Sequence, residues 1–242
     1  MSERGSGEMD GTSNGRSRRR LGVGGRLLLG ALLTALTLGG CSAVEDLSGA
    51  TVGSGTAATQ ERTVGTFDAV RSSASIQVDI TVGPAGSVQV RADDNLLSNL
   101  VTEVQGSTLS VSWTGSVSQR SPAVVTVTMP ELTSLEAESS SEITATGVSA
   151  ASLMVAASSS ARITASGTAD GLDLGAASSA EVDLSGLVAQ QATVDLSSSA
   201  RATVHVVGPV SGGVASSATL VLVGQPASVN VATSSSGTVV QK

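Results

Sequence analysis

The sequence has few aromatic side chains, few basic residues and only one cysteine. Its 242 residues include one Trp, one Phe, no Tyr and one Cys, and 13 basic residues stand against 20 acidic ones. A single cysteine excludes an internal disulfide framework and a zinc site built from several cysteines. Nucleic-acid binding requires a basic surface and usually aromatic rings on which bases can stack. We therefore expect no nucleic-acid partner.

The first forty residues have the pattern of a secretion signal, although their apolar run is short. A basic segment, Arg16 to Arg26, precedes twelve apolar-leaning residues, Leu27 to Leu38. Such a run is too short to cross a bilayer, which takes about 20 residues. A basic segment followed by a short apolar one and then small residues is typical of a cleaved signal peptide.

The only cysteine directly follows this stretch. The segment Leu38-Gly39-Gly40-Cys41 resembles the lipobox of bacterial lipoproteins, in which small residues precede the cleaved bond and the thiol receives the lipid. The resemblance predicts a lipoprotein signal peptide over residues 1–40 and acyl chains, such as palmitate, attached through Cys41. More than one acyl chain gives stable anchoring, so we expect an extracytoplasmic protein on the cell membrane. The alternative is a free Cys41 behind an ordinary signal peptide.

Residues 41–61 carry little that could order them. They consist mostly of Ser, Gly, Thr and Ala, with no Pro and no aromatic residue. Such a segment buries too little apolar surface to fold. We expect it to be a flexible, lipid-anchored tether that holds the domain roughly 25 Å from the membrane. The remaining residues, 62–242, are enough for one domain with a sizeable core.

Apolar and polar residues alternate along much of residues 62–242, which predicts strands. The clearest segments are Ile76–Ile80, Val88–Ala92, Leu109–Trp113 and Val125–Met129. One short helix is expected around residues 94–101, where Asp93 or Asp94 could cap a turn that carries several leucines. A loop is the alternative for this segment.

A serine-rich motif recurs along the C-terminal half at nearly constant spacing. Two serines, a small residue and a polar residue precede an aliphatic position, and successive aliphatic positions lie 20, 19, 20, 18 and 19 residues apart. These positions are Ile143, Ile163, Val182, Ala202, Leu220 and Val239. Repeats of this length cannot bury an apolar face singly, so they predict a solenoid with a continuous core.

Each repeat has room for two strands joined by the serine-rich corner. Positions four and six residues before the first serine, such as Val155 and Leu153, should point inward together with the aliphatic position after the serines. The serines would form a corner ladder in which hydroxyls bond backbone groups or the hydroxyls of the next coil. The predicted fold is all-β, a parallel β-helix of about 19-residue coils with an N-terminal strand region. A β-sandwich is the alternative.

Several segments resemble a known family of unknown function. Arg62–Val70, Val88–Leu97, Val125–Leu132 and Ser234–Val239, with the serine corners, are similar to the putative auto-transporter adhesin head GIN domain family. The resemblance covers residues 62–242 and implies a right-handed parallel β-helix. The family's corners usually read Gly-Ser-Gly, whereas this chain has Ser-Ser-Ala or Ser-Ser-Ser. If the family glycine has a positive φ, serine at that position is strained.

Few side chains are candidates for catalysis. The only histidine, His205, lies in a strand pattern that points it outward. A Ser-His-Asp triad would have to recruit Ser199 or Ser217, and Asp183 or Asp195, from neighbouring coils. We therefore interpret His205 as a surface residue and expect no catalytic residues and no cofactor.

Acidic residues are candidates for calcium binding at two places, Asp93-Asp94-Asn95 and the pair Glu181 and Asp183. Because the Asp-Gly repeats of calcium-binding β-rolls are missing, we interpret them as surface charge or a cap and expect no metal. One motif position alternates in sign between successive repeats, which predicts modest pairing between coils. The residues at this position are Glu142, Arg162, Glu181 and Arg201.

These observations favour a non-enzymatic, lipid-anchored extracytoplasmic protein that serves adhesion, binding or envelope structure. Its expected partners are the membrane, through the anchor, and an unknown protein or envelope polysaccharide. The alternative function is binding of, or action on, polysaccharide, which predicts clustered outward carboxylates and exposed aromatic rings, of which Trp113 is the one candidate. Since no polar cap is evident after the sixth motif, end-to-end self-association is a further expectation.

Overall fold

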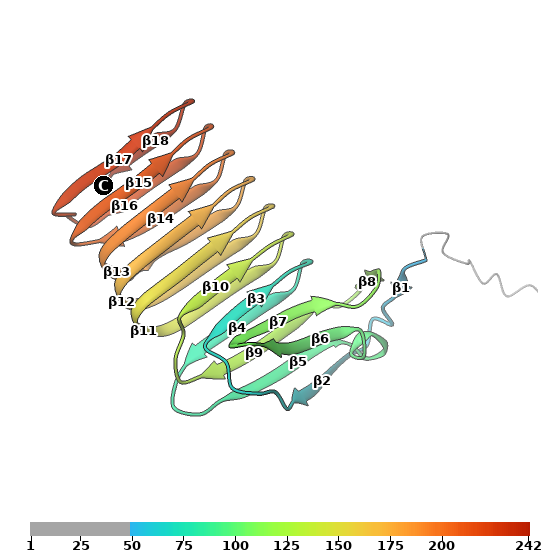
Figure 1. Ribbon diagram of the computed structural model, residues 1–242. Coiled ribbons are helices and arrows are strands. Elements are labelled where there is room, and N and C mark those ends of the chain that lie inside the picture. The colour runs from blue at the N-terminus through green and yellow to red at the C-terminus, as the bar shows by residue number, and fades with distance from the viewer. Residues whose placement is uncertain (1–48) are drawn as a thin grey trace, which may run out of the picture. The chain divides into compact units, whose positions relative to one another are not determined.

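The computed structural model describes residues 49–242, which form a stack of β-coils that follows a region of antiparallel strands (Figure 1). The first strands are β1 (Thr51–Val52), β2 (Ala57–Arg62), β3 (Ala69–Ser72), β4 (Gln77–Val82), β5 (Ser87–Asp93), β6 (Leu100–Gln105), β7 (Thr108–Trp113), β8 (Val117–Ser118) and β9 (Val124–Met129). The later strands are β10 (Ser134–Ala137), β11 (Glu142–Ala157), β12 (Arg162–Ala176), β13 (Glu181–Leu196), β14 (Arg201–Val206), β15 (Pro209–Val214), β16 (Thr219–Val223), β17 (Ser228–Thr233) and β18 (Thr238–Gln241). No helix in this part of the chain is long and apolar enough to cross a membrane.

The serine-motif repeats are the coils of a β-solenoid. Parallel pairing places Ile143 beside Ile163 and Ile163 beside Val182, so equivalent positions of successive motifs stack. The first sheet has the order β2-β5-β9-β4-β11-β12-β13-β14-β16-β18. The second sheet has the order β6-β7-β3-β10-β11-β12-β13-β15-β17. The predicted solenoid with an N-terminal strand region is confirmed, and the β-sandwich alternative is wrong.

Columns of aliphatic side chains fill the space between the two sheets. Leu135, Val155, Leu174 and Val194 stack on the second sheet and are fully buried, and Ile143 belongs to the buried column that faces them. Each such side chain stabilises the fold by about 1.5–3 kcal/mol through its burial. Coils spaced about 4.8 Å apart leave little room for large rings, which explains the scarcity of aromatic residues.

Each serine corner contains two consecutive residues in the left-handed region of backbone conformation. Their φ angles lie between 46° and 66°. The residues are Ala74, Ser75, Ser139, Ser140, Ser159, Ser160, Ser178, Ser179, Ser198, Ser199, Ser216, Ser217, Ser235 and Ser236. In one corner the N–H of Ala161 donates to the carbonyl of Ser158 at 3.1 Å across Ser159 and Ser160, as in a type I′ turn. A non-glycine residue in this conformation costs about 1–2 kcal/mol, so the corners are strained as predicted.

Backbone hydrogen bonds join each corner to the next. The N–H of Ser160 donates to the carbonyl of Ser178, and the N–H of Ser179 to that of Ser198, both at 3.0 Å. Equivalent bonds continue from Ser75 to the last corner, so the left-handed pairs direct their polar groups along the stack. Within the described residues, the hydroxyls of these paired serines have no hydrogen bond. The prediction of a hydroxyl ladder is therefore wrong, because the backbone supplies the ladder.

Glycines form the opposite corner, where the chain bends from the first sheet toward the second. Gly147 has a φ of 72° and Gly167 a φ of 134°. A Cβ atom at Gly167 would overlap the carbonyl oxygen of Val148, so no other residue fits there. The register between β11 and β12 shifts at this bend. These glycines thus close the coils at the corner opposite the serines.

The N-terminal strands close the first end of the solenoid. Strand β5 is antiparallel to both β2 and β9, and β6 is antiparallel to β7. Strands β9 and β7 then pair in parallel with β4 and β3, which begin the coils. The parallel stack is thus bounded at this end by antiparallel strands (Figure 1).

Strand β2 corrects the prediction of a flexible tether over residues 41–61. Residues 57–62 pair in antiparallel register with residues 88–93, and Arg62 Nη2 donates to the carbonyls of Leu97 at 2.6 Å and Leu100 at 3.2 Å. The side chains of β2 are small or polar and mostly exposed, so composition gave no sign of order. The free edge of β5 orders this segment through its backbone. Residues 41–48 lie outside the described residues, and there the tether remains a prediction.

Asp93 is a buried carboxylate that joins three segments. Its Oδ1 accepts a hydrogen bond from the N–H of Gly55 at 3.0 Å, and its Oδ2 accepts from Arg120 at 2.8 Å and Ser121 at 3.2 Å. Hydrogen bonds to the charged form favour it, so these N–H groups, that of Arg120 foremost, hold the pKa of Asp93 below its usual value. Asp93 therefore fastens the start of β2 to the loop before β9.

The helix predicted around residues 94–101 is shorter than expected. A single 3-10 turn, η1, covers Asp94–Leu96, and β6 begins at Leu100. Asp93 precedes this turn but makes no capping hydrogen bond with it, because its carboxylate binds other segments. Leu96 and Leu100 are both buried, and this packing favours a short turn after which the chain re-enters the sheet at Leu100.

Glycine should stabilise the fold at a left-handed serine position. Ser199 has a φ of 65°, so Ser199→Gly removes steric strain and should raise the free energy of unfolding by about 1 kcal/mol. Ser197, in the same corner, is outside the left-handed region, so Ser197→Gly should lower the free energy of unfolding by about 0.5–1 kcal/mol. Urea denaturation followed by circular dichroism measures both, and equal effects would contradict the strained corner.

The contribution of Asp93 should depend on pH. Its pKa is lower in the folded than in the unfolded state, so its stabilisation is complete above about pH 4 and is lost as pH falls through the folded pKa. We expect Asp93→Asn to lower the melting temperature at pH 7 and to have a smaller effect at about pH 2.5. The exposed Asp170 is the control, since Asp170→Asn should change neither. A D93N deficit that is the same at both pH values argues against this role.

Candidate functional site

The predicted lipid-attachment site, Cys41, and the predicted signal peptide, residues 1–40, lie outside the described residues. Both remain predictions. The structure bears only on the chain that follows: β1 begins at Thr51, so nine residues, 42–50, separate Cys41 from the first strand. The segment available as a tether is therefore about half as long as composition indicated.

His205 makes no hydrogen bond with a serine hydroxyl or a carboxylate among the described residues. It lies in β14, half-buried, and its Nδ1 is 3.3 Å from the carbonyl oxygen of Ser185. Ser199 and Ser217 belong to the left-handed corners, where their N–H groups hold successive coils together. Asp195 lies on the second sheet, whereas His205 lies on the first. The interpretation of His205 as a surface residue, partly covered, agrees with this geometry.

The acidic cluster around Asp94 serves to hold the N-terminal segment. Asp94 Oδ1 accepts from the N–H of Asn95 at 2.7 Å. The side chain of Asn95 donates to the carbonyl of Val52 at 2.9 Å and accepts from the N–H of Ser54 at 2.8 Å. Among residues 49–242, no group of three or more His, Cys, Asp or Glu side chains is placed to hold a metal ion.

The predicted charge alternation between coils produces one ion pair. Arg162 donates through Nη2 to Glu181 Oε2 at 2.6 Å and through Nε at 3.2 Å. This contact raises the pKa of Arg162 above its usual value. Register also places Glu142 beside Arg162 and Glu181 beside Arg201, but neither forms an ion pair in the described structure. An exposed pair of this kind contributes about 0–1 kcal/mol, so it is a minor structural contact.

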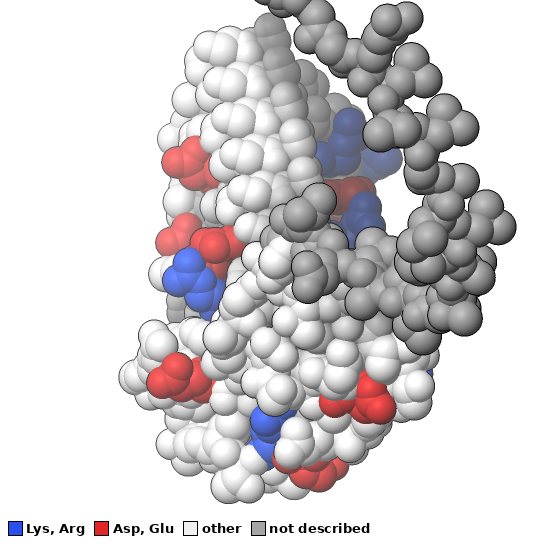
Figure 2. Space-filling view, turned by 90° about the vertical axis from the view of Figure 1, so that its right-hand side faces the viewer, with Lys and Arg blue, Asp and Glu red and all other residues white. Residues whose placement is uncertain are grey.

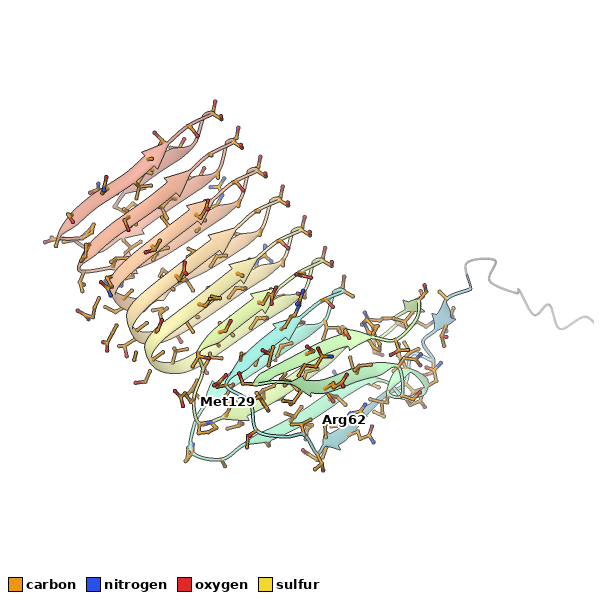
Figure 3. All side chains as sticks on the ribbon, in the orientation of Figure 1. Arg62 and Met129 are labelled. Carbon is orange, nitrogen blue, oxygen red and sulfur yellow. The ribbon has the colours of Figure 1, made fainter. Side chains whose placement is uncertain are left out.

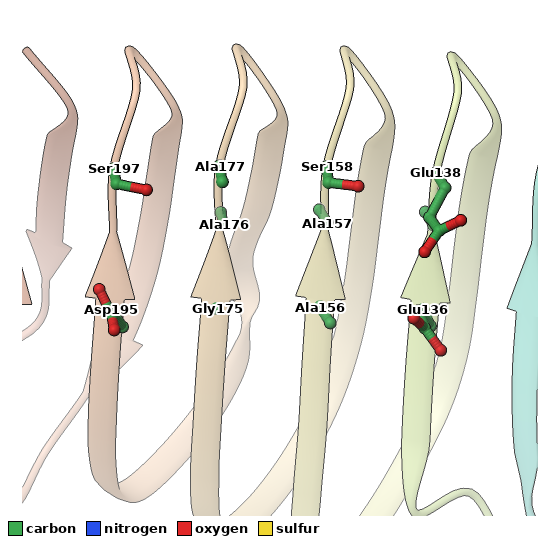
Figure 4. Close-up of a pocket in the computed structure, with 11 residues that line it drawn as sticks. Glu136, Glu138, Ala156, Ala157, Ser158, Gly175, Ala176, Ala177, Asp195 and Ser197 are labelled. Atoms are coloured by element: carbon green, nitrogen blue, oxygen red, sulfur yellow. The ribbon is translucent and has the colours of Figure 1, made fainter. Parts of the chain in front are cut away.

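A hollow of about 340 Å³ lies on the outer face of the second sheet, across β10 to β13. Glu136 of β10 and Glu138, just after β10, stand on one side, and Asp195 of β13 and Ser197, just after β13, stand on the other (Figure 4). Between these walls the floor is made of small residues: Ala156, Ala157, Ser158, Gly175, Ala176 and Ala177. We call this hollow the sheet furrow. It can accept an extended chain laid on the sheet.

The low surface continues along β12. A neighbouring hollow of about 230 Å³ includes Gly171 and Asp173 of β12 and Gln191 of β13 in its lining. Because alternate residues of a strand share a face, Gly171, Asp173 and Gly175 all point outward. Two of the three have no side chain, so the outer face of β12 is lower than those of its neighbours.

Nothing in the backbone requires glycine at position 175. No atom lies within 4 Å of the place its Cβ would occupy, and its φ is outside the left-handed region. Gly167, in the same strand, differs in both respects: its φ is positive, and a Cβ atom there would overlap the carbonyl oxygen of Val148. Glycine inside a strand weakens it and often marks a place where a ligand or another backbone approaches closely. Gly175 therefore identifies the sheet furrow as the candidate binding surface.

The walls of the sheet furrow are acidic. Glu136 and Glu138 share Arg71, whose Nη2 lies 3.6 and 2.9 Å from their carboxylate oxygens. Asp195, and Asp173 in the neighbouring hollow, have no ion pair within residues 49–242. The surface thus combines unpaired carboxylates with small, uncharged side chains, a chemistry that suits basic groups.

The carboxylates of the sheet furrow do not form an acid and base pair for glycoside hydrolysis. Three strand spacings, roughly 14 Å, separate Glu136 from Asp195, whereas such pairs lie about 5–9.5 Å apart. Asp173 and Asp195, on adjacent strands two residues out of register, are roughly 8 Å apart. Both are exposed on the outer face of the sheet.

The sheet furrow could not be found from the sequence because none of its residues, considered singly, indicates a binding site. Ala156 and Gly175 become neighbours only when β11 and β12 are aligned, and Gly175 meets Asp195 only through the pairing of β12 with β13. The signal was the position three residues before the first left-handed serine of each repeat. Across successive repeats it reads Glu136, Ala156, Gly175 and Asp195.

A larger hollow, of about 580 Å³, lies beside the segment that joins β2 to β3. Its lining includes Arg62, Phe67 and Met129, and Figure 3 labels Arg62 and Met129. Arg62 binds backbone carbonyls through Nη2, while its buried Nε has no hydrogen-bond partner. Glu61, also in the lining, accepts from Gln89 Nε2 at 2.6 Å. Both charged residues thus hold β2 in place, which is a structural role.

Solved structures with this fold come from bacteria. A Bacteroides fragilis structure described as a putative adhesin has a TM-score of 0.62 and 15% identity, over 79% of this chain and 99% of that one. A putative adhesin from Parabacteroides merdae has a TM-score of 0.57 and 16% identity, over 79% and 98%. A Parabacteroides distasonis structure described as a putative lipid binding protein has a TM-score of 0.50 and 19% identity, over 79% and 99%. At these identities the likeness shows the fold alone, and no curated protein matches the chain.

The sequence itself matches a family at residues 66–226. The matched segment begins just before β3 and ends shortly after β16, so it includes the antiparallel strands β5, β6, β7 and β9, though not β2, and most of the serine corners. It covers about two thirds of the sequence. The chain therefore belongs to the family described as "Putative auto-transporter adhesin, head GIN domain".

Proposed function

We propose that this protein is a non-enzymatic binding protein of the cell envelope, held at the membrane by lipid on Cys41, which presents the sheet furrow to an extended partner. Membership of an adhesin-like family supports a binding function and an extracytoplasmic place. The observation that carries the proposal is Gly175, a strand residue that no backbone constraint requires and that keeps the floor of the furrow open.

The preferred partner is a protein segment in extended conformation with basic side chains. The sheet furrow lies on parallel strands, so an extended backbone can align with it, and its small floor residues allow close approach. Asp173 and Asp195 have no ion pair of their own and are available to Lys or Arg side chains. Charge of this kind contributes chiefly to specificity and to the rate of association.

Envelope polysaccharide is the second candidate, and the outward hydroxyl and carboxylate groups of the same surface favour it. The lining of the sheet furrow includes Ser158, Ser197 and three acidic residues, all able to bind sugar hydroxyls. It includes no aromatic ring on which a sugar could stack. This makes the basic protein segment the better candidate.

The proposed anchor leaves a short linker. The nine residues between Cys41 and β1 span roughly 17 Å if they behave as a flexible chain. This distance keeps the start of the folded region close to the membrane surface.

Filling the furrow floor should abolish binding without harming the fold. Gly175→Val adds a branched side chain where no atom lies within 4 Å, and valine favours strands, so we expect unchanged or higher thermal stability. The affinity of the protein for isolated envelopes of its own organism should fall at least tenfold, which is about 1.4 kcal/mol. Fluorescence titration with the lipid-free protein measures this.

Gly213 provides a matched control for this test. It points outward from β15, in register with Asp195, and has comparable free space, but it does not line the sheet furrow. Gly213→Val should bind as the unsubstituted protein does. If G175V also binds normally, the furrow is not the binding surface.

Loss of binding in high salt supports the basic partner, whereas salt-resistant binding that glycan-degrading enzymes abolish supports polysaccharide.

Replacing the proposed lipidated residue should release the protein from the membrane. Cys41→Ala removes the thiol that would carry the lipid, so the exported protein should move from the membrane fraction to the soluble fraction. Ser42→Ala is the control and should stay with the membrane. Metabolic labelling with a palmitate analogue, followed by fractionation, measures both properties. Retention of C41A in the membrane fraction would refute the anchor.

A further inference from the structure

The last coil of the solenoid leaves two strand edges unpaired within the described residues. Strand β17 pairs only with β15, and β18 pairs only with β16. The inward side chains of this coil, Val231 and Val239, are only partly buried, whereas their equivalents in earlier coils are fully covered. Val229 and Val240 are 36% and 38% exposed. This end therefore combines free backbone donors and acceptors with uncovered apolar surface.

The same end has almost no charge. Between Arg201 and Lys242 the sequence contains no Asp, Glu, Lys or Arg. On the face seen in Figure 2, the topmost residues of the stack are white, and the red and blue residues lie below them. Natural proteins commonly protect exposed strand edges with charged side chains, proline or bulges. The free edges of β17 and β18 contain none of the charged residues that would serve this purpose.

The other end of the solenoid is built differently. Its outermost strands, β2 and β6, are antiparallel to their neighbours. Strand β2 carries Glu61 and Arg62, and β6 carries Glu103. Charged edges of this kind oppose pairing with another strand. A head-to-tail contact between the two ends is therefore disfavoured, and the charge-free end fits best against its own copy.

The distribution of negative charge also favours a tail-to-tail contact. Every acidic residue of the chain precedes residue 196, and the chain carries a net charge of −7. Two copies that meet through their last coils keep these acidic regions apart. Side-by-side contacts would bring them together and would be opposed by repulsion.

We propose that two copies of this protein pair tail to tail, with the edges of β17 and β18 in one copy adding to those of the other. A two-fold axis can bring the two ends together in two ways. In one, each strand meets the same strand of the other copy in reversed direction; in the other, β17 of one copy meets β18 of the other. Since β17 and β18 run in opposite directions around the coil, either arrangement makes the new strand pairs antiparallel. The contact uses the same residues in both copies and closes at two, as an isologous interface does.

The size of this contact predicts a weak dimer. A coil has strands of about 20 Å in two sheets about 10 Å apart, so with side chains the contact covers about 400 Å² per copy. The total of about 800 Å² is below the range for stable complexes, which begins near 1,200 Å². We expect a dissociation constant above about 1 µM. The local concentration of a protein held at a membrane can be higher than this, so a weak dimer can form there.

Sedimentation velocity on the lipid-free mature chain, residues 41–242 with C41A, tests this pairing. From about 5 µM to about 1 mM, the mass should rise from one chain toward two and no further. The double variant Val229→Lys, Val240→Lys charges both edges and should remain monomeric with an unchanged circular dichroism spectrum. Met154→Lys replaces a 53% exposed side chain in the middle of the stack and should dimerise normally.

Three outcomes overturn the proposal. The unsubstituted protein could remain monomeric at the highest concentration, or the double variant could dimerise as the unsubstituted protein does. Growth beyond two chains would show an open head-to-tail contact instead. Gly175→Val should dimerise normally, so loss of partner binding through the sheet furrow and loss of self-association are measured independently.

Discussion

The backbone ladder through the serine corners is the constraint on which the rest of the structure depends. In every coil two residues adopt positive φ, and their N–H and C=O groups then point along the stack toward the neighbouring corner. The strain of about 1–2 kcal/mol for each residue persists because these backbone groups would otherwise be exposed or unpaired. The next residue, Ala in most corners, is buried between coils and must be small. These requirements align the serine corners of successive coils and keep the core columns beside them in register. The small differences in repeat length are taken up at the opposite corner, where the register shifts.

Constant register makes the outer faces modular. A substitution at an outward position changes one point in a column without disturbing the inward columns, since alternate residues face opposite sides. The column Glu136, Ala156, Gly175 and Asp195 shows the result: two acidic positions flank two positions with little or no side chain. The corners therefore determine the shape of the molecule, and the outward columns determine what it can bind. Fold and function are separable in this protein to an unusual degree, which is why the family fold alone does not identify a partner.

The repeat, the core columns and the solenoid could be predicted because period and alternation are written directly in the sequence. Ile143 and Ile163 are recognisable as equivalent without any structure. Strand β2 could not be predicted, because its small and polar residues are ordered by the free edge of β5 rather than by their own burial. The role of Asp93 also depends on distant partners, Gly55 and Arg120, that no local pattern connects. The sheet furrow was hidden for a related reason, since it exists only across strands and follows from their register.

The two ends of the solenoid differ in a way that bears on how the protein could act at a surface. The folded region begins at Thr51, beside the strands that close the first end, whereas the uncharged edges lie at the last coil. The proposed anchor, Cys41, joins the chain at the first end, nine residues before β1, and not at the last coil. A tail-to-tail pair then has its two anchors at opposite ends, which is the geometry of a contact between two apposed membranes rather than between upright neighbours on one. The sheet furrow lies on the side of the stack, so it remains accessible in such a pair, and each pair presents two furrows. Two weak sites held in one assembly bind a repeated partner more tightly than either does alone. Self-association and partner binding would thus reinforce each other without sharing a residue.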